Sequence, residues 1–195
     1  MVTTQKVDFP NFTWINISNP TENEIRKLGE EYKFHPLDLN DCLTLSHRSK
    51  IDIYRKYTFL VFLFPVYREP TREIFASELN FFIGKDYLIS INRGDLKVFN
   101  NFFDLFRLSS DLRQKYPDKS PEKLLYEILH KIFLYCFPMI DHLSDDCDAI
   151  EKAIFSGREK HMVSEILVIR RNITDFRRIM QVHKNVLKKA IINFK

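Results

Sequence analysis

Long apolar runs are scarce in this chain of 195 residues. A helix needs about 20 mostly apolar residues to cross a bilayer. The longest apolar runs, from Phe59 to Val66 and from Ile132 to Ile140, contain only 8 and 9 residues. The first residues, Met1 to Asp8, also lack the basic start and apolar stretch of a signal peptide. We therefore expect no membrane-spanning helix in this sequence and a location in the cytosol.

Glycine, proline and cysteine are also sparse. With 4 glycines, 8 prolines and 45% hydrophobic residues, the composition favours a folded core over disorder. The three cysteines, Cys42, Cys136 and Cys147, never form a Cys-x-x-Cys pair, so neither a disulfide framework nor a zinc ribbon is indicated. We expect a reducing compartment.

Signatures of catalysis are missing as well. The sequence has no Gly-rich phosphate loop, no His-Glu-x-x-His pair and no Gly-x-Ser-x-Gly elbow, so we expect that the protein is not an enzyme. Phenylalanine, in contrast, is abundant with 18 residues, which indicates large apolar faces covered by another element or another chain. This abundance favours an oligomer over a monomer.

Hydrophobic periodicity predicts a sheet. Phe12 to Ile17 alternates apolar and polar residues, as a half-buried strand does. Tyr57 to Val66 is apolar at both alternating sets of positions, which predicts a strand buried on both faces. Phe75 to Ile83 and Tyr87 to Ile91 predict a hairpin whose connection contains Gly84.

Helices are predicted on either side of these strands. Thr21 and Glu24 have the spacing of a capping box, Pro36 fits the first turn of a shorter helix, and the apolar spacing from Asp95 to Tyr116 predicts another helix. Helices on both faces of a sheet give an α+β fold, here an α/β/α sandwich with a mixed sheet. We assign it to residues 1–118.

The remaining residues, 119–195, predict long antiparallel helices. Ser120-Pro121 is a helix start signal, and Ser156-Gly157 ends the first helix. The second helix, Glu159 to Lys195, meets no glycine or proline at its end, so we expect a truncated helix that continues beyond this sequence.

The second helix has an apolar seam and a strong basic bias. Its residues 158–195 contain 10 Lys and Arg against 3 Asp and Glu, whereas residues 1–157 contain 20 against 23. Apolar residues spaced by 4 and 3 are typical of a coiled coil. The seam consists of Met162, Ile166, Ile169, Ile173, Phe176, Met180, His183, Leu187, Ala190 and Phe194.

Five short pieces, in this order, resemble the cytoplasmic N-terminal domain of CorA-type magnesium transporters. The pieces are Trp14-Ile15-Asn16-Ile17, Thr21-Glu22-Asn23-Glu24, His35-Pro36-Leu37, Lys50-Ile51-Asp52-Ile53-Tyr54 and Tyr57-Thr58-Phe59-Leu60-Val61-Phe62. The resemblance extends from Trp14 onward. It implies that Asp145 to Glu151 belongs to an acidic helix and that Val163 to Ala190 begins a stalk helix.

The resemblance also implies a function. The chain would be the cytoplasmic regulatory domain of a divalent ion transporter or channel, on the cytoplasmic side of the cell membrane. The membrane helices and their Gly-Met-Asn motif would follow outside this sequence. Mg²⁺, with Co²⁺ or Zn²⁺ as alternatives, would be both the transported ion and a regulatory ligand. Ions bound between the protomers of a homopentamer would clamp the closed state, and their loss would favour opening.

Two residues are candidate metal ligands under this resemblance. Asp52 lies where the family commonly has an acidic residue, although Arg55 and Lys56 beside it repel cations, and a solvated carboxylate at a strand end is the alternative. His130 lies where the family usually has Asp, and its imidazole would favour zinc or cobalt over magnesium. A partly packed helix histidine is the alternative for His130.

Other polar residues have simpler interpretations. Asp145, Asp146, Asp148 and Glu151 fit a solvated helix face that tunes the local electrostatics. His183 falls on the apolar seam, where a single polar residue can fix the register of packed helices.

A basic stripe on the second helix supports an alternative function. It could make the chain an interaction module for a nucleic acid or a protein partner. The stripe lacks interleaved aromatic residues, so we expect no nucleic acid partner. The stripe consists of Arg170, Arg171, Arg177, Arg178, Lys184, Lys188 and Lys189.

Overall fold

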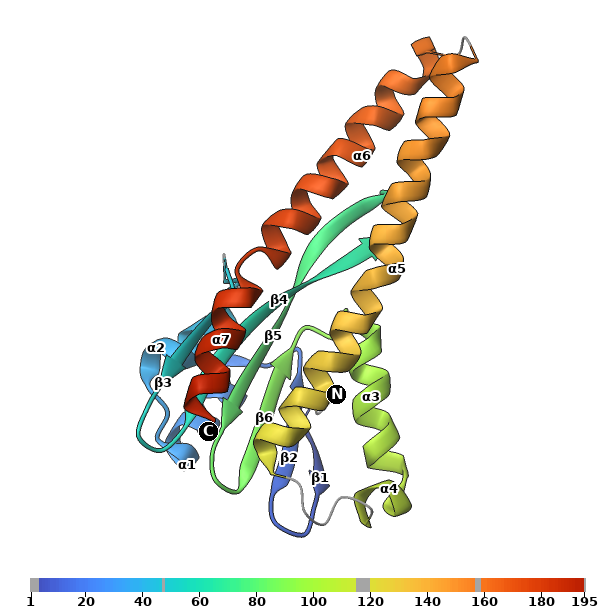
Figure 1. The fold of residues 1–195 in the computed structure, drawn as a ribbon. Coiled ribbons are helices and arrows are strands. Elements are labelled where there is room, and N and C mark those ends of the chain that lie inside the picture. The colour runs from blue at the N-terminus through green and yellow to red at the C-terminus, as the bar shows by residue number, and fades with distance from the viewer. Residues whose placement is uncertain (1–3, 47, 115–119, 157–158, 195) are drawn as a thin grey trace.

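The computed structural model describes residues 4–46, 48–114, 120–156 and 159–194 (Figure 1). Its centre is a six-stranded sheet in the order β1-β2-β6-β5-β4-β3. Strands β2 and β6 pair in parallel and the other neighbours pair antiparallel, which confirms the predicted mixed sheet. The strands are β1 (Thr4–Asp8), β2 (Thr13–Ser18), β3 (Lys50–Ile53), β4 (Thr58–Arg68), β5 (Glu73–Ile83) and β6 (Tyr87–Asn92).

Strand β4 is apolar and buried on both faces. Phe59 and Val61 point to one face and Leu60 and Phe62 to the other, and all four side chains are 0% exposed. The prediction of a doubly buried strand is confirmed. Both faces of the sheet therefore need helical cover.

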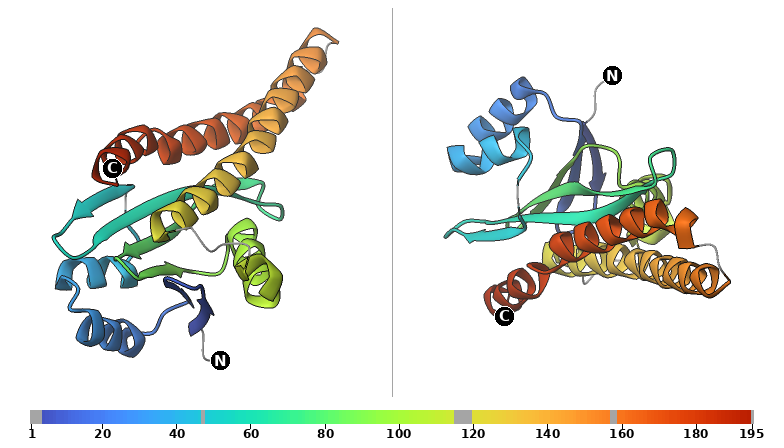
Figure 2. Two further views of the ribbon diagram at one scale, coloured as in Figure 1. Left: turned by 60° about the horizontal axis from the view of Figure 1, so that its bottom comes forward. Right: turned by 90° about the horizontal axis from the view of Figure 1, so that it is seen from above.

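Helices cover both faces, as Figure 2 shows. Helices α1 and α2 pack on the face that carries Phe59, and α3, α5 and α7 pack on the face that carries Phe62. This confirms the α/β/α sandwich. The helices are α1 (Glu22–Tyr32), α2 (Pro36–Leu43), α3 (Lys97–Leu108), α4 (Ser110–Gln114), α5 (Pro121–Phe155), α6 (Glu159–Met180) and α7 (His183–Asn193).

Local sequence signals set the starts of α1 and α2. The backbone N–H of Thr21 donates to Glu24 Oε2 at 2.9 Å, and the backbone N–H of Glu24 donates to Thr21 Oγ1 at 3.3 Å. This is the predicted capping box. At α2, Pro36 occupies the first turn, and His35 Nδ1 accepts from the backbone N–H of Leu37 at 3.2 Å.

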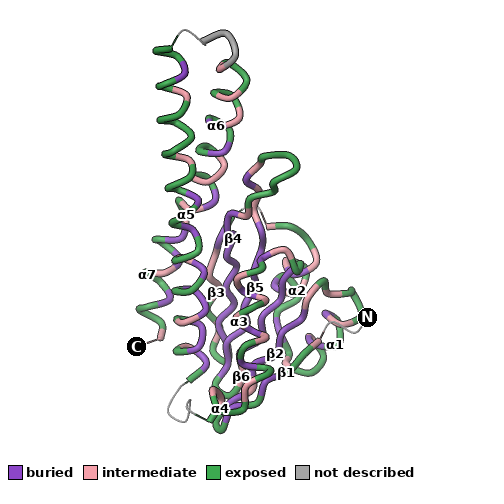
Figure 3. Tube along the Cα trace, turned by 90° about the vertical axis from the view of Figure 1, so that its right-hand side faces the viewer, coloured by how far each residue is buried: buried purple, intermediate pink, exposed green. Residues whose placement is uncertain are grey.

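Helices α5 and α6 form the predicted antiparallel hairpin, which projects past the sheet (Figure 1). Buried residues of α5 concentrate in its first half, from Pro121 to Met139, where the helix crosses the sheet. Beyond that point the hairpin is largely exposed, as Figure 3 shows. Its two arms pack mainly against each other there.

The prediction of one continuous helix from Glu159 onward is wrong. Helix α6 ends at Met180, a turn follows, and α7 begins at His183 and lies on the sheet. The physical reason is burial, because Val186 and Ala190 of α7 pack into the core that contains β4. Helix α7 therefore covers the sheet, whereas the prediction placed its residues in a stalk helix that projects from the domain.

The predicted boundary between residues 118 and 119 lies outside the described residues, and the division into two domains stays a prediction. Tyr116, the predicted end of the helix after the sheet, also lies outside them, as does Lys195. Within the described part, α3 ends at Leu108 and the short α4 follows.

His183 lies at the point where α7 meets the sheet. Its ring is 3% exposed and surrounded by Phe62, Phe64 and Phe133, with ring centroids 5.2–5.5 Å away. Neither ring nitrogen meets hydrogen-bond geometry with a group in the described part of the chain. Burial lowers the pKa of His183 to about 4, and the backbone of Leu63 opposes this shift only in part.

We predict that His183 makes the fold sensitive to acid. Between pH 6.5 and about 4 the unfolded chain binds a proton at His183 that the folded chain does not bind. The free energy of unfolding should therefore fall by about 3 kcal/mol as the pH drops through this window. His183→Leu should remove that part of the pH dependence in urea unfolding, and His142→Gln, at an exposed position, should keep it. Equal pH profiles of wild type and His183→Leu would contradict the assignment.

Candidate functional site

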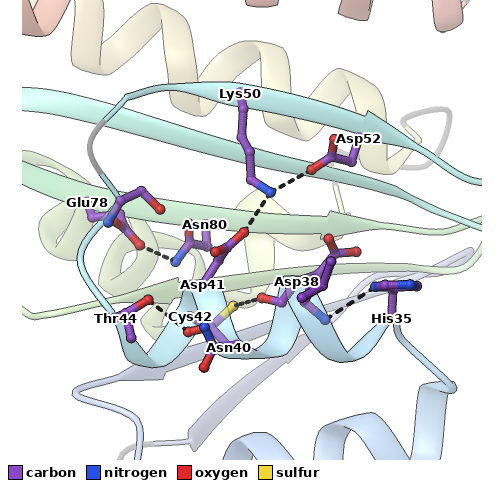
Figure 4. A network of polar contacts seen from close by, with 12 residues as sticks. His35, Asp38, Asn40, Asp41, Cys42, Thr44, Lys50, Asp52, Glu78 and Asn80 are labelled. Carbon is purple, nitrogen blue, oxygen red and sulfur yellow. Dashed lines mark hydrogen bonds and ion pairs between the residues drawn. The ribbon is translucent and has the colours of Figure 1, made fainter.

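Asp52 lies on edge strand β3, facing helix α2 (Figure 4). Lys50 and Asp52 are two residues apart, so their side chains share one face of the strand. Lys50 Nζ lies 2.7 Å from Asp52 Oδ2 and 2.6 Å from Asp41 Oδ2 of α2. One ammonium group thus joins a carboxylate of the sheet to a carboxylate of the helix.

The ammonium of Lys50 is held in its charged form. Partial burial lowers the pKa of Lys50, but hydrogen bonds and Coulomb attraction to Asp52 and Asp41 outweigh burial, and the pKa lies above its ordinary value. A divalent ion at Asp52 would have to compete with this tethered cation. Arg55 and Lys56 follow at the exposed end of the strand and add to the repulsion.

A second carboxylate of α2 is buried behind this ion pair. Asp38 is 1% exposed, and it accepts hydrogen bonds from the hydroxyls of Tyr57 at 2.8 Å and Tyr54 at 3.1 Å. Burial raises the pKa of Asp38, and the two hydroxyl donors partly oppose that shift. Asp38 therefore anchors α2 to the strand-end tyrosines and is not open to an external ligand.

A further buried carboxylate is Glu78 on β5, which has its own set of partners. Glu78 is 3% exposed and accepts from the backbone N–H of Ser46 and from Asn80 Nδ2. Burial raises its pKa, and these donors oppose the rise. Sequence reasoning missed this residue, although Glu78 and Asn80 are conspicuous polar positions, two residues apart, in an otherwise apolar strand.

His130 lies on the other side of the molecule. It is exposed on α5 and stacks on Tyr126, with ring centroids 5.8 Å apart. Helix α5 covers the face opposite to α2, so the structure does not bring His130 and Asp52 together. Among the described residues, no three His, Cys, Asp or Glu side chains gather in a way that could hold a metal ion.

The remaining charged candidates are at the surface. Asp145, Asp146, Asp148 and Glu151 are exposed on the outer half of α5, which agrees with a solvated face. Part of the basic stripe is engaged within the chain: Arg171 pairs with Glu73 at 2.8 Å and Arg178 with Asp175 at 2.8 Å.

Of the helices in the described ranges, none combines the length and the apolar character that a bilayer-spanning segment requires.

We predict that the ammonium group of Lys50 weakens the binding of divalent metal ions at Asp52. Lys50→Met should lower the stability by about 1 kcal/mol, because Asp41 and Asp52 then lose their shared partner at a site that is partly open to water. Millimolar Mg²⁺ should raise the melting temperature of this variant more than that of the wild type, since a hard cation suits paired carboxylates. Lys50→Arg, which keeps the charge, is the control. Equal shifts of the melting temperature with Mg²⁺ in the wild type, Lys50→Met and Lys50→Arg would contradict the competition between Lys50 and Mg²⁺.

Comparison with known proteins agrees with the fold. The family model described as "CorA-like Mg2+ transporter protein" matches residues 10–193. The cobalt/magnesium transport protein CorA of Thermotoga maritima is 23% identical over 90% of this chain and 49% of its own length. The putative metal ion transporter YfjQ of Bacillus subtilis is 20% identical over 96% of this chain and 57% of its own. The chain thus spans about half the length of these curated relatives.

Solved structures support the same architecture. The soluble domain of CorA from Methanocaldococcus jannaschii superposes with a TM-score of 0.74 at 19% identity, over 91% of this chain and 69% of that one. The ZntB cytoplasmic domain from Vibrio parahaemolyticus gives 0.68 at 11% identity, over 99% and 84%. At these identities the likeness concerns the fold. Because the family model covers nearly the whole sequence, the chain belongs to the CorA-like Mg²⁺ transporter family.

Proposed function

We propose that the chain is the cytoplasmic regulatory domain of a divalent metal ion transporter or channel of the CorA type. The observation that carries this proposal is the family match over residues 10–193, within relatives that are about twice as long. Those relatives are named as transporters, which supports a role in ion transport and not in catalysis. The ion pathway would then lie in parts of the protein outside this sequence.

The intact protein would be a homopentamer attached to the cytoplasmic side of the membrane by helices that follow this domain. Mg²⁺ would be the main transported ion, with Co²⁺ or Zn²⁺ as alternatives. Ions bound between protomers would hold the pore closed, and a fall in the cytoplasmic ion concentration would release them. Coupling of this kind requires only that the ion bind the closed assembly better than the open one.

Asp52 would provide one carboxylate of a regulatory site. Its side chain is 39% exposed at the edge of the sheet, where a residue from a second protomer can complete the coordination. Mg²⁺ is usually held by one or two carboxylates and keeps several waters, so such a site is chemically sufficient. Competition from Lys50 would make the site weak, which suits a sensor of millimolar ion concentrations.

His130 would provide a separate ligand on the opposite side of the molecule. Its ring is exposed on α5 and can turn toward a neighbouring protomer. Imidazole suits Zn²⁺ and Co²⁺ better than Mg²⁺. The two residues would therefore respond to different ions.

Thermal unfolding with added ions tests both assignments. A ligand that binds only the folded state at ten times its dissociation constant stabilises by about 1.4 kcal/mol, or about 3 °C for a domain of this size. We expect Mg²⁺ to give such a shift in the wild type and not in Asp52→Asn. Zn²⁺ and Co²⁺ should lose their effect in His130→Ala.

Controls separate binding from general charge effects. Asp145→Asn and His142→Ala change exposed residues of α5 and should leave both ion responses intact. The absence of any shift with Mg²⁺, Co²⁺ or Zn²⁺ would contradict ion sensing by this domain and both ligand assignments. Membership of the family would be unaffected.

A further inference from the structure

A hollow of about 330 Å³ lies where the far ends of β4 and β5 meet the α5–α6 hairpin (Figure 1). We call the strand ends from Tyr67 to Ile74, which pair with each other, the arm. The hollow is lined by Glu69 of the arm, Asp146 of α5 and Asn172 of α6, among others, and we call it the joint hollow. Its volume is at the small end of the range for ligand pockets, about 300–1,000 Å³.

The walls of the joint hollow are held together by Asn172. This side chain is only 4% exposed, its Oδ1 accepts from the backbone N–H of Ile74 at 3.1 Å, and its Nδ2 donates to the carbonyl of Arg72 at 3.0 Å. The ion pair of Arg72 with Glu165, at 2.7 Å, ties the arm to α6 a second time. The hollow is therefore preformed, as ligand sites usually are.

The floor of the joint hollow is apolar. Ile74 of the arm and Met139 of α5 are 5% and 8% exposed, and Leu143 packs against the cluster that contains Ile74. Met139, His142, Leu143 and Asp146 are spaced by 3, 1 and 3 residues, so they lie on one face of α5. A floor of this kind accepts the hydrocarbon part of a ligand.

The rim of the joint hollow carries negative charge. Glu69 and Asp146 are exposed and line the hollow from different elements. Within the described ranges, no ion pair engages either carboxylate. Arg72 of the arm donates to both carboxylate oxygens of Glu165, at 3.1 and 2.7 Å, which offsets its positive charge. The two rim carboxylates therefore favour a cation in the hollow.

We propose that the joint hollow binds a small organic cation, with its ammonium group between Glu69 and Asp146 and its apolar body on the floor. Tyr67 lines the hollow and offers an aromatic face on which a cation can lie. A bare metal ion fits less well, because among the residues that the structure describes no three His, Cys, Asp or Glu side chains gather to hold one. A bound ligand would link the arm to α5 and stiffen the hairpin against the sheet. The proposal does not rest on ion transport.

Phenethylamine is the probe for this site, because it carries an ammonium group on a small apolar body. Isothermal titration calorimetry with the full chain should show binding at one site. Two matched compounds test the role of charge, since 2-phenylethanol has the same body without charge and phenylacetate has the opposite charge. We expect the alcohol to bind about tenfold more weakly than the amine, because it cannot form charge-assisted hydrogen bonds, and the acid not to bind.

Glu69→Gln and Asp146→Asn test the rim. Each substitution removes one carboxylate and keeps the size of the side chain, so each should lower the affinity for phenethylamine about tenfold. Asp145→Asn is the matched control, because the neighbouring residue loses the same charge about 100° around α5, away from the hollow. This control should bind phenethylamine like the wild type.

His142→Cys locates the ligand. In a Cys147→Ser background this exposed position on the rim should react with maleimide, whereas Cys42 and Cys136 are buried and serve as internal controls. Phenethylamine at ten times its dissociation constant should slow the labelling of this variant about tenfold, because it occupies most of the hollows. The same concentration of 2-phenylethanol should slow it much less.

Several results would overturn the proposal. They are a lack of phenethylamine binding, equal binding of 2-phenylethanol, and an unchanged affinity when Glu69→Gln and Asp146→Asn are combined. Labelling of the His142→Cys variant that phenethylamine does not slow would place the ligand elsewhere. Displacement of the amine by millimolar Mg²⁺ would reassign the joint hollow to metal ions.

Discussion

The structure depends on the burial of β4 on both of its faces. Alternate side chains of this strand point in opposite directions, and those from Phe59 to Phe62 are fully buried. Helices α1 and α2 exclude water from one face, and α3, α5 and α7 from the other. The face that carries Phe62 must also be shielded from water. This requirement explains why α6 ends at Met180 and why α7 packs back on the sheet.

The same constraint places the functional candidates at the margins. Helix α2 is held against the sheet, where Asp41 meets Lys50 and Asp52 at an edge strand. The sheet covers only the first half of α5, so the outer hairpin keeps an apolar groove between its two helices. Both regions lie where a second copy could reach them.

Much of the fold follows from local patterns. Alternating apolar residues predicted β2, a continuous apolar run predicted β4, and a hairpin pattern around Gly84 predicted β5 and β6. The Thr21 capping box predicted α1. Strand β1 was not predicted, since only Val7 among its five residues is buried. The break before α7 was not predicted. Apolar residues spaced by 4 and 3 give a helix one apolar face, and that face can pack on another helix or on a sheet. The assignment of Asp52 as a metal ligand stays a prediction. Its ion pair with Lys50 follows from their spacing of two residues in one strand, but the second carboxylate on Lys50 could not be foreseen, because Asp41 comes from a separate helix.

Native-state hydrogen exchange tests most directly whether α7 is part of the covering layer of the sheet. If it is, amides of α7 near Val186 and Ala190 should open together with those of β4, with equal dependence on denaturant. Amides of the outer hairpin, around Ile166, should exchange faster through local opening. Fast exchange throughout α7, with β4 still protected, would contradict the account, because the helix would then be an independent rod and not cover for the sheet.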